Sequence, residues 1–115
     1  KYTEYLGVTP ENDSVGVLQD THWSWGDFGY FPSYAVGSAI AAQIYFHMRE
    51  IMDFDDILRK GNLAEVKEYL GSHIHRYGMV YDMNELLLRM TGEKFNPQYY
   101  VEYLKEKYEK LYDLK

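Results

Sequence analysis

The chain has 115 residues, the size of one ordinary domain, and its 46 % apolar and 17 % aromatic content excludes a disordered protein, because so much apolar surface must collapse into a core. The formal net charge of −6 argues against a surface for nucleic acid or anionic membranes, which requires clustered Lys and Arg. The sequence contains no Cys, which excludes disulfides and fits a reducing compartment, and no secretory signal is visible.

Residues 1–14 are rich in Gly, Pro, Asn, Asp and Ser and predict little regular structure. The stretch over residues 16–37 is the most distinctive part of the chain. Between His22 and Tyr34 it concentrates two Trp, two Phe, two Tyr and a His. This composition is too aromatic and too rigid for a solvated linker, so we expect the stretch to position functional groups.

Pro32 and Ser33 predict the start of a helix over residues 33–52. Its apolar residues cover nearly the whole circumference, which predicts a buried helix. Four small residues of this helix suggest that another helix packs closely against it: Gly37, Ser38, Ala41 and Ala42. This partner helix could lie outside the chain. No Asp, Glu, Lys or Arg occurs from Phe28 to Met48, but polar residues and Pro32 interrupt this run, so we do not expect a membrane span.

The remainder, residues 53–115, predicts short amphipathic helices. They run from Asp53 to Lys60, from Asn62 to just before Gly78, from Asp82 to near Gly92, and from Asn96 to the C-terminus. Asn62 is expected to cap the second of them. Gly61, Gly78 and Gly92 are expected to end helices, and Asp82 with Glu85 resembles a capping box. No stretch alternates with the period of a strand, so the predicted fold class is all-α.

Most of the histidines and carboxylates predict no metal site. His73 and His75 are two residues apart and would point in nearly opposite directions on a helix. His47 with Glu50 lacks a third ligand. The acidic run over residues 53–56 lacks the Gly and Glu that a calcium loop requires at its sixth and twelfth positions.

His22 is the exception. Its neighbours Gln19 and Asp20 can fix one tautomer of the imidazole, while Trp23 and Trp25 can exclude water around it. We therefore expect its proton to act in a drier setting than bulk water.

Tyr30 and Tyr34 are four residues apart, which would place them on one side of a helix or of its entry turn. Their hydroxyls could then bind a developing oxyanion or a carboxylate. The alternative is an aromatic mini-core that encloses a hydrogen-bonded, buried His22.

The residues from Gly16 to Trp23 read Gly-Val-Leu-Gln-Asp-Thr-His-Trp. This octapeptide resembles the Gly-x-x-Gln-Asp-x-His-Trp signature of the zinc carboxypeptidases typified by carboxypeptidase Taq. The residues that follow, up to Tyr34, and several later segments are also similar to that family. The resemblance extends over essentially the whole chain.

The resemblance implies a cytoplasmic, all-helical, two-lobed zinc metallopeptidase with a deep groove, which removes C-terminal amino acids from peptides and forms a homodimer. In this family a His-Glu-x-x-His helix and a downstream Glu hold one Zn²⁺, which Co²⁺ can often replace, and the Glu of that motif acts as general base. Residues 1–115 contain no His-Glu-x-x-His. We therefore expect the chain to be the C-terminal portion of a longer enzyme, without metal ligands and inactive without its upstream part.

Within that frame, His22 would hydrogen-bond the substrate or the tetrahedral intermediate, and Tyr34, or else Tyr30, would stabilise the oxyanion or bind a carboxylate. Gln19, Asp20 and Trp23 would support these contacts.

The alternative is a stand-alone helical module whose aromatic stretch binds a protein or peptide without catalysis. The two hypotheses predict different exposure for the helix over residues 33–52. If Val36, Ile40 and Ile44 are all enclosed, the module is favoured, and if they line an exposed apolar face, the fragment is favoured.

Overall fold

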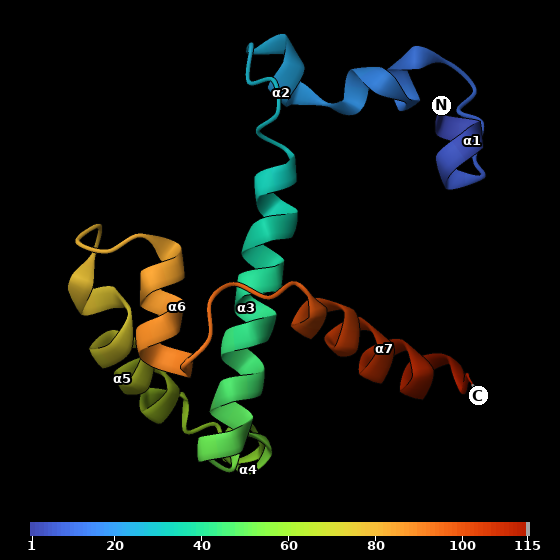
Figure 1. Ribbon diagram of the computed structural model, residues 1–115. Coiled ribbons are helices and arrows are strands. Elements are labelled where there is room, and N and C mark those ends of the chain that lie inside the picture. Colours follow the sequence, from blue (N-terminus) through green and yellow to red (C-terminus); the bar gives the residue numbers. More distant parts are fainter. Residues whose placement is uncertain (115) are drawn as a thin grey trace. The chain divides into compact units, whose positions relative to one another are not determined.

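The computed structural model describes residues 1–114, and every regular element within them is a helix, which confirms the predicted all-α class (Figure 1). The chain divides into two compact units, of which the first comprises residues 1–35 and the second begins at Val36. Helix α3 (Pro32–Ile51) starts in the first unit and continues through the second. In the described part of the chain, no helix is both long enough and apolar enough to cross a membrane.

The first unit is built from short helical turns, which are α1 (Tyr2–Leu6), the 3-10 turns η1 (Asp13–Val15) and η2 (Val17–Gln19), and α2 (Thr21–Ser24). Helix α1 was not expected, because the composition of residues 1–14 predicted little regular structure. Gly7 ends the helix in the left-handed region, at φ 68°. Within residues 1–35 the only buried residue is Gly16, where a Cβ would come within 3.1 Å of the Pro10 side chain. No side chain of this unit is therefore buried in a core.

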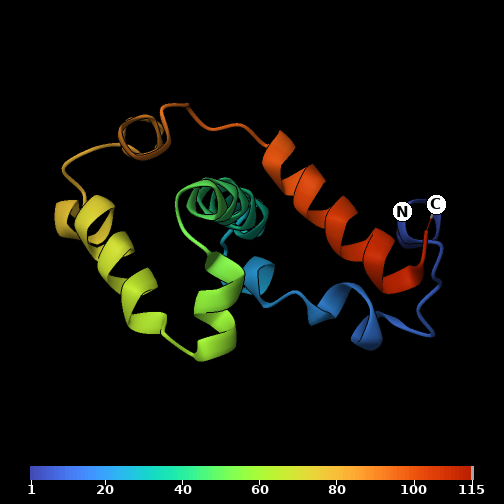
Figure 2. The same ribbon diagram turned by 90° about the horizontal axis from the view of Figure 1, so that it is seen from below.

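The second unit contains the rest of α3 and, in chain order, α4 (Phe54–Lys60), α5 (Leu63–His73), the 3-10 turn η3 (His75–Tyr77), α6 (Met83–Thr91) and α7 (Gln98–Tyr112). Figure 2 looks along α3 and shows these helices arranged around it. The core consists of small and medium apolar side chains from three of the helices: Ala39, Ala42, Met48, Ile57, Leu86, Leu87 and Met90.

Local hydrogen bonds explain where several of these helices begin and end. Asp82 Oδ1 accepts from the Glu85 amide at 2.9 Å and caps α6, and Gly92 ends that helix at φ 80°. Asn62 was expected to cap α5 in the same way. Its side-chain amide instead donates to Glu65 Oε2 at 3.2 Å, so α5 has no side-chain cap.

Within the described residues, α3 is not buried on all sides as its apolar circumference predicted. Its first turns, up to Ser38, are exposed, and burial begins at Ala39. Val36 is 48 % exposed, and Ile40 and Ile44 are half-buried. Residues 1–114 supply too few neighbours to enclose the whole helix.

A buried polar side chain ties α3 to the segment between α6 and α7. Gln43 is 1 % exposed; its Nε2 donates to the Lys94 carbonyl at 3.1 Å, and its Oε1 accepts from the Asn96 amide at 3.0 Å. Both ends of the side chain are therefore satisfied, as burial of an amide requires. Through these bonds Gln43 fixes the path of the chain just before α7.

Candidate functional site

The candidate site lies in the first unit, where Asp20 and His22 form a hydrogen-bonded pair. Asp20 caps α2, because its Oδ1 accepts from the His22 amide at 2.9 Å. The same oxygen is 2.9 Å from His22 Nδ1. An ionised carboxylate can only accept, so Nδ1 must carry a proton, and in the neutral imidazole Nε2 is left with its lone pair. The pair thus selects one tautomer of His22.

Three aromatic rings surround the imidazole of His22. The Tyr30 ring stacks on it with a centroid distance of 5.5 Å and an interplanar angle of 30°. Phe31 and Tyr34 meet it edge-on, at 5.5 Å and 5.8 Å. Tyr30 and Tyr34 also contact each other, at 5.8 Å and 86°. The side chain of His22 is only 21 % exposed as a result.

The backbone between α2 and α3 brings these rings onto His22. Gly26 and Gly29 adopt φ values of 85° and 77°, which side chains disfavour, and they allow the chain to reverse. The Asp27 amide donates to the His22 carbonyl at 2.9 Å, and the Ser33 hydroxyl donates to the Tyr30 carbonyl at 2.6 Å. Ser33 therefore lies inside the first turn of α3, where it holds the turn that carries Tyr30.

The two Trp residues do not enclose His22 as the sequence suggested. Trp25 is 85 % exposed, and Trp23, also exposed, pairs with Phe28 at 5.8 Å. Phe31 occupies the position that the tryptophans were expected to fill. It was missed because only its spacing pointed to it: Phe31 lies three residues before Tyr34, on the same side of the turn that enters α3.

Gln19 also differs from the expectation. Its side-chain amide donates to the Ser14 carbonyl and has no hydrogen bond to His22. Gln19 therefore supports the turn that precedes α2, while Asp20 alone orients the imidazole.

One nitrogen of the imidazole is open to a ligand. Among residues 1–114, no group forms a hydrogen bond with His22 Nε2. Every buried side-chain N or O atom of these residues has a hydrogen-bond partner, so Nε2 is not one of the buried atoms. It follows that Nε2 is accessible to solvent. The site accordingly offers an imidazole nitrogen beside two tyrosine rings.

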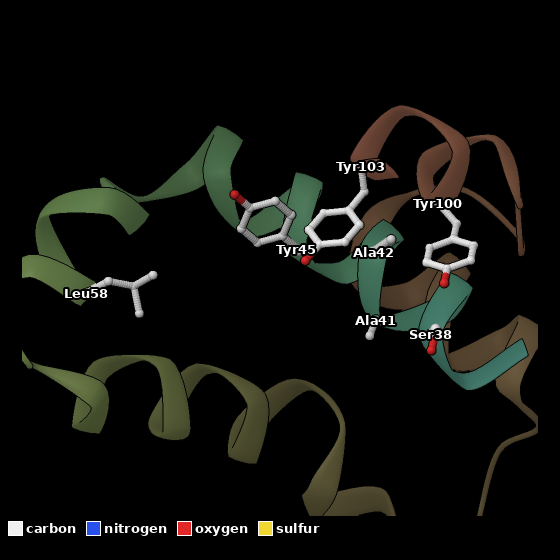
Figure 3. A pocket seen from close by; sticks show the side chains of 7 residues that line it. All are labelled: Ser38, Ala41, Ala42, Tyr45, Leu58, Tyr100 and Tyr103. Carbon is white, nitrogen blue, oxygen red and sulfur yellow. The ribbon is translucent and has the colours of Figure 1, made fainter. Parts of the chain in front are cut away.

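A second feature is an apolar pocket of about 560 Å³ in the second unit (Figure 3). It is lined by residues of α3, α4 and α7: Ser38, Ala41, Ala42, Tyr45, Leu58, Tyr100 and Tyr103. The lining contains three tyrosines but no His, Asp, Glu, Lys or Arg, so the pocket offers mainly packing surface.

Comparison with known proteins gives the same family as the Gly16–Trp23 signature. Residues 1–108 match the carboxypeptidase Taq (M32) metallopeptidase family. The chain belongs to this family. It is 43 % identical over 113 residues to "Carboxypeptidase 1" of Bacillus subtilis, a match that covers 97 % of this chain and 23 % of the relative. It is 41 % identical over 104 residues to "Thermostable carboxypeptidase 1" of Pyrococcus furiosus, covering 90 % of this chain and 21 % of that relative.

Solved structures of the M32 family have the same fold. The "Trypanosoma Cruzi Metallocarboxypeptidase 1" structure superposes with a TM-score of 0.85 at 40 % identity, over 93 % of this chain and 23 % of that one. The chain therefore spans about a quarter or less of the length of the M32 relatives it matches.

Membership of this metallopeptidase family implies a metal cofactor, so we asked whether the described residues could hold one. Among residues 1–114, no three His, Cys, Asp or Glu side chains come together as a metal-binding group. The described residues therefore do not by themselves supply the donor set of a metal centre.

Proposed function

We propose that the chain is the C-terminal segment of a zinc-dependent carboxypeptidase, in which it supplies substrate and transition-state contacts but no zinc ligand. The substrate is a peptide, and the product is its released C-terminal amino acid. In this proposal the Zn²⁺, or Co²⁺ in its place, is held by the upstream part of the same enzyme, and the complete protein is a cytoplasmic homodimer. The match to M32 carboxypeptidases over residues 1–108 supports the assignment.

His22 and Tyr34 are the proposed catalytic residues, with Tyr30 as the second candidate for the role of Tyr34. The observation that carries this assignment is the open Nε2 of His22 beside two tyrosine rings, within the octapeptide signature of the family. A preorganised phenol can stabilise negative charge that develops on a reacting carbonyl oxygen, and a preorganised imidazole can accept a hydrogen bond from the substrate. Asp20 acts as a positioning residue, and Gln19 and Trp23 have supporting roles outside direct contact with the imidazole.

The alternative, a stand-alone binding module, requires a closed apolar core around α3. Val36 is half-exposed, and Ile40 and Ile44 are only half-buried. By the criterion derived from the sequence, this exposure favours a segment of a larger protein.

The test is substitution of His22 by Ala in the intact, metal-loaded enzyme that contains this chain. Loss of one hydrogen bond to the reacting group typically lowers the rate about tenfold, and we expect kcat/KM for an N-blocked dipeptide to fall by at least that factor. Trp25→Phe is the matched control, because Trp25 is exposed and has no ring contact with His22, and it should retain activity. Undiminished activity of His22→Ala would refute the catalytic role.

The 115-residue chain alone gives a second test. With Zn²⁺ or Co²⁺ added, it should not hydrolyse the same dipeptide. Metal-dependent hydrolysis by the isolated chain would contradict the proposal that the zinc ligands lie elsewhere.

A further inference from the structure

The hydrogen bond between Asp20 and His22 decides what His22 can offer to a ligand. Asp20 Oδ1 receives the Nδ1 proton, so the neutral imidazole presents Nε2 as a hydrogen-bond acceptor. This nitrogen has no partner among residues 1–114 and is accessible. A neutral His22 therefore accepts an N–H group and cannot donate to an oxygen.

The two tyrosines offer the complementary group. Neither Tyr30 nor Tyr34 has a hydrogen bond to its hydroxyl among the described residues, and both side chains are exposed. Their rings contact the imidazole at 5.5 Å and 5.8 Å and contact each other at 5.8 Å. One acceptor nitrogen and two phenolic donors thus share a single aromatic cluster of His22, Tyr30, Phe31 and Tyr34.

We infer that this cluster recognises both halves of the scissile peptide amide, with His22 Nε2 accepting from its N–H and a tyrosine hydroxyl donating to its carbonyl oxygen. A secondary amide carries one donor and one acceptor, which match the groups that the cluster presents. The inference rests on the proposed function and adds a substrate feature to it. An ester lacks the N–H, so the enzyme loses the His22 contact with an ester but keeps the tyrosine contact.

The experiment compares a peptide with its depsipeptide, in which an ester oxygen replaces the scissile N–H, in the intact metal-loaded enzyme. We expect His22→Phe to lower kcat/KM for the peptide about tenfold more than for the depsipeptide, the size of one lost hydrogen bond. Tyr34→Phe and Tyr30→Phe are matched variants. Whichever tyrosine donates to the carbonyl should affect both substrates equally, because both retain the C=O group.

The outcomes separate this inference from the proposed function. If His22→Phe lowers kcat/KM equally for both substrates, His22 acts on the carbonyl oxygen, which overturns amide recognition while the catalytic role stands. If His22→Phe leaves both substrates unaffected, the catalytic role of His22 fails as well.

A second variant and a spectroscopic measurement test the inference independently, in case His22→Phe does not fold. Asp20→Asn can donate to Nδ1 and thereby favour the opposite tautomer, so it should show the same selective loss for the peptide. In two-bond ¹H–¹⁵N spectra of the chain, neutral His22 should be protonated at Nδ1 in the wild type and at Nε2 in Asp20→Asn. A wild-type imidazole protonated at Nε2 would overturn the inference whatever the activity.

Discussion

The two units of the chain are held together in different ways. In the first unit no side chain is buried, and the contacts of the His22 cluster join residues close in sequence, from Asp20 to Tyr34. In the second unit, the Gln43 hydrogen bonds join residues more than 50 positions apart around a core of buried apolar side chains. If the proposed site is correct, changes in the first unit should mainly alter ligand contacts, and changes in the second unit should mainly alter the free energy of unfolding.

The core of the second unit should give the largest effect. Leu87 of α6 is 1 % exposed, whereas its neighbour Leu88 is 44 % exposed. Leu87→Ala should lower the free energy of unfolding by about 2–5 kcal/mol, because it removes buried methyl groups and leaves a cavity. Leu88→Ala, the matched control on the same helix, should cost less than about 1 kcal/mol. Urea unfolding followed by far-UV circular dichroism measures both, and equal costs would show that α6 does not pack as described.

The second-largest effect on the free energy of unfolding is expected at the polar contact between α3 and the segment before α7. Gln43→Ala leaves the Lys94 carbonyl and the Asn96 amide without their partner and should cost about 1–3 kcal/mol in the free energy of unfolding. Gln98→Ala removes an exposed glutamine and should change stability by no more than about 0.5 kcal/mol. If the two variants unfold at the same urea concentration, Gln43 does not fix the segment.

A substitution in the first unit tests whether the two units unfold independently. Asp20→Ala removes the cap of α2 and should destabilise that turn by about 0.5–2 kcal/mol. The only tryptophans, Trp23 and Trp25, lie in this unit, so their fluorescence reports on it selectively. We expect the fluorescence transition to shift to lower urea while the circular dichroism transition of the second unit stays in place. A common shift would show that the units unfold together.

The smallest effect concerns alkaline pH. Burial raises the pKa of Tyr69 above its ordinary value of 10.0, and its hydroxyl lies 3.0 Å from His47 Nε2, between α5 and α3. Above pH 10 the unfolded chain releases this proton before the folded chain does. The folded state then binds more protons, so the stability contributed by Tyr69 is complete below pH 10 and is lost as pH rises through the raised pKa.

This pH dependence is measurable from urea midpoints between pH 9 and pH 11. The wild type should lose slightly more stability over this range than Tyr69→Phe, which has no hydroxyl to ionise. Tyr112→Phe is the control, because Tyr112 is exposed near the end of α7. Parallel pH profiles for the wild type and Tyr69→Phe would contradict a raised pKa in the folded state.

Much of the local structure could be predicted because its causes lie within a few residues. The cap of α6 by Asp82 and its end at Gly92 depend on hydrogen bonds and dihedral angles within one turn. The Asp20–His22 pair is separated by two residues and belongs to the same class of contact. One local prediction failed because of a competing local contact: the Asn62 side chain donates to Glu65 and does not cap α5.

By itself, the sequence determined the helical class, the octapeptide signature of the M32 family and the pairing of Asp20 with His22, because each depends on residue types at short spacing. Only the tertiary structure decided that Phe31 rather than Trp25 packs on His22, that Gln43 binds the segment before α7, and that the first turns of α3 remain exposed. These features depend on how the chain reverses between helices and on which residues far apart in sequence become neighbours. Helical periodicity identifies an apolar surface, but the elements that cover it are set by the path of the whole chain.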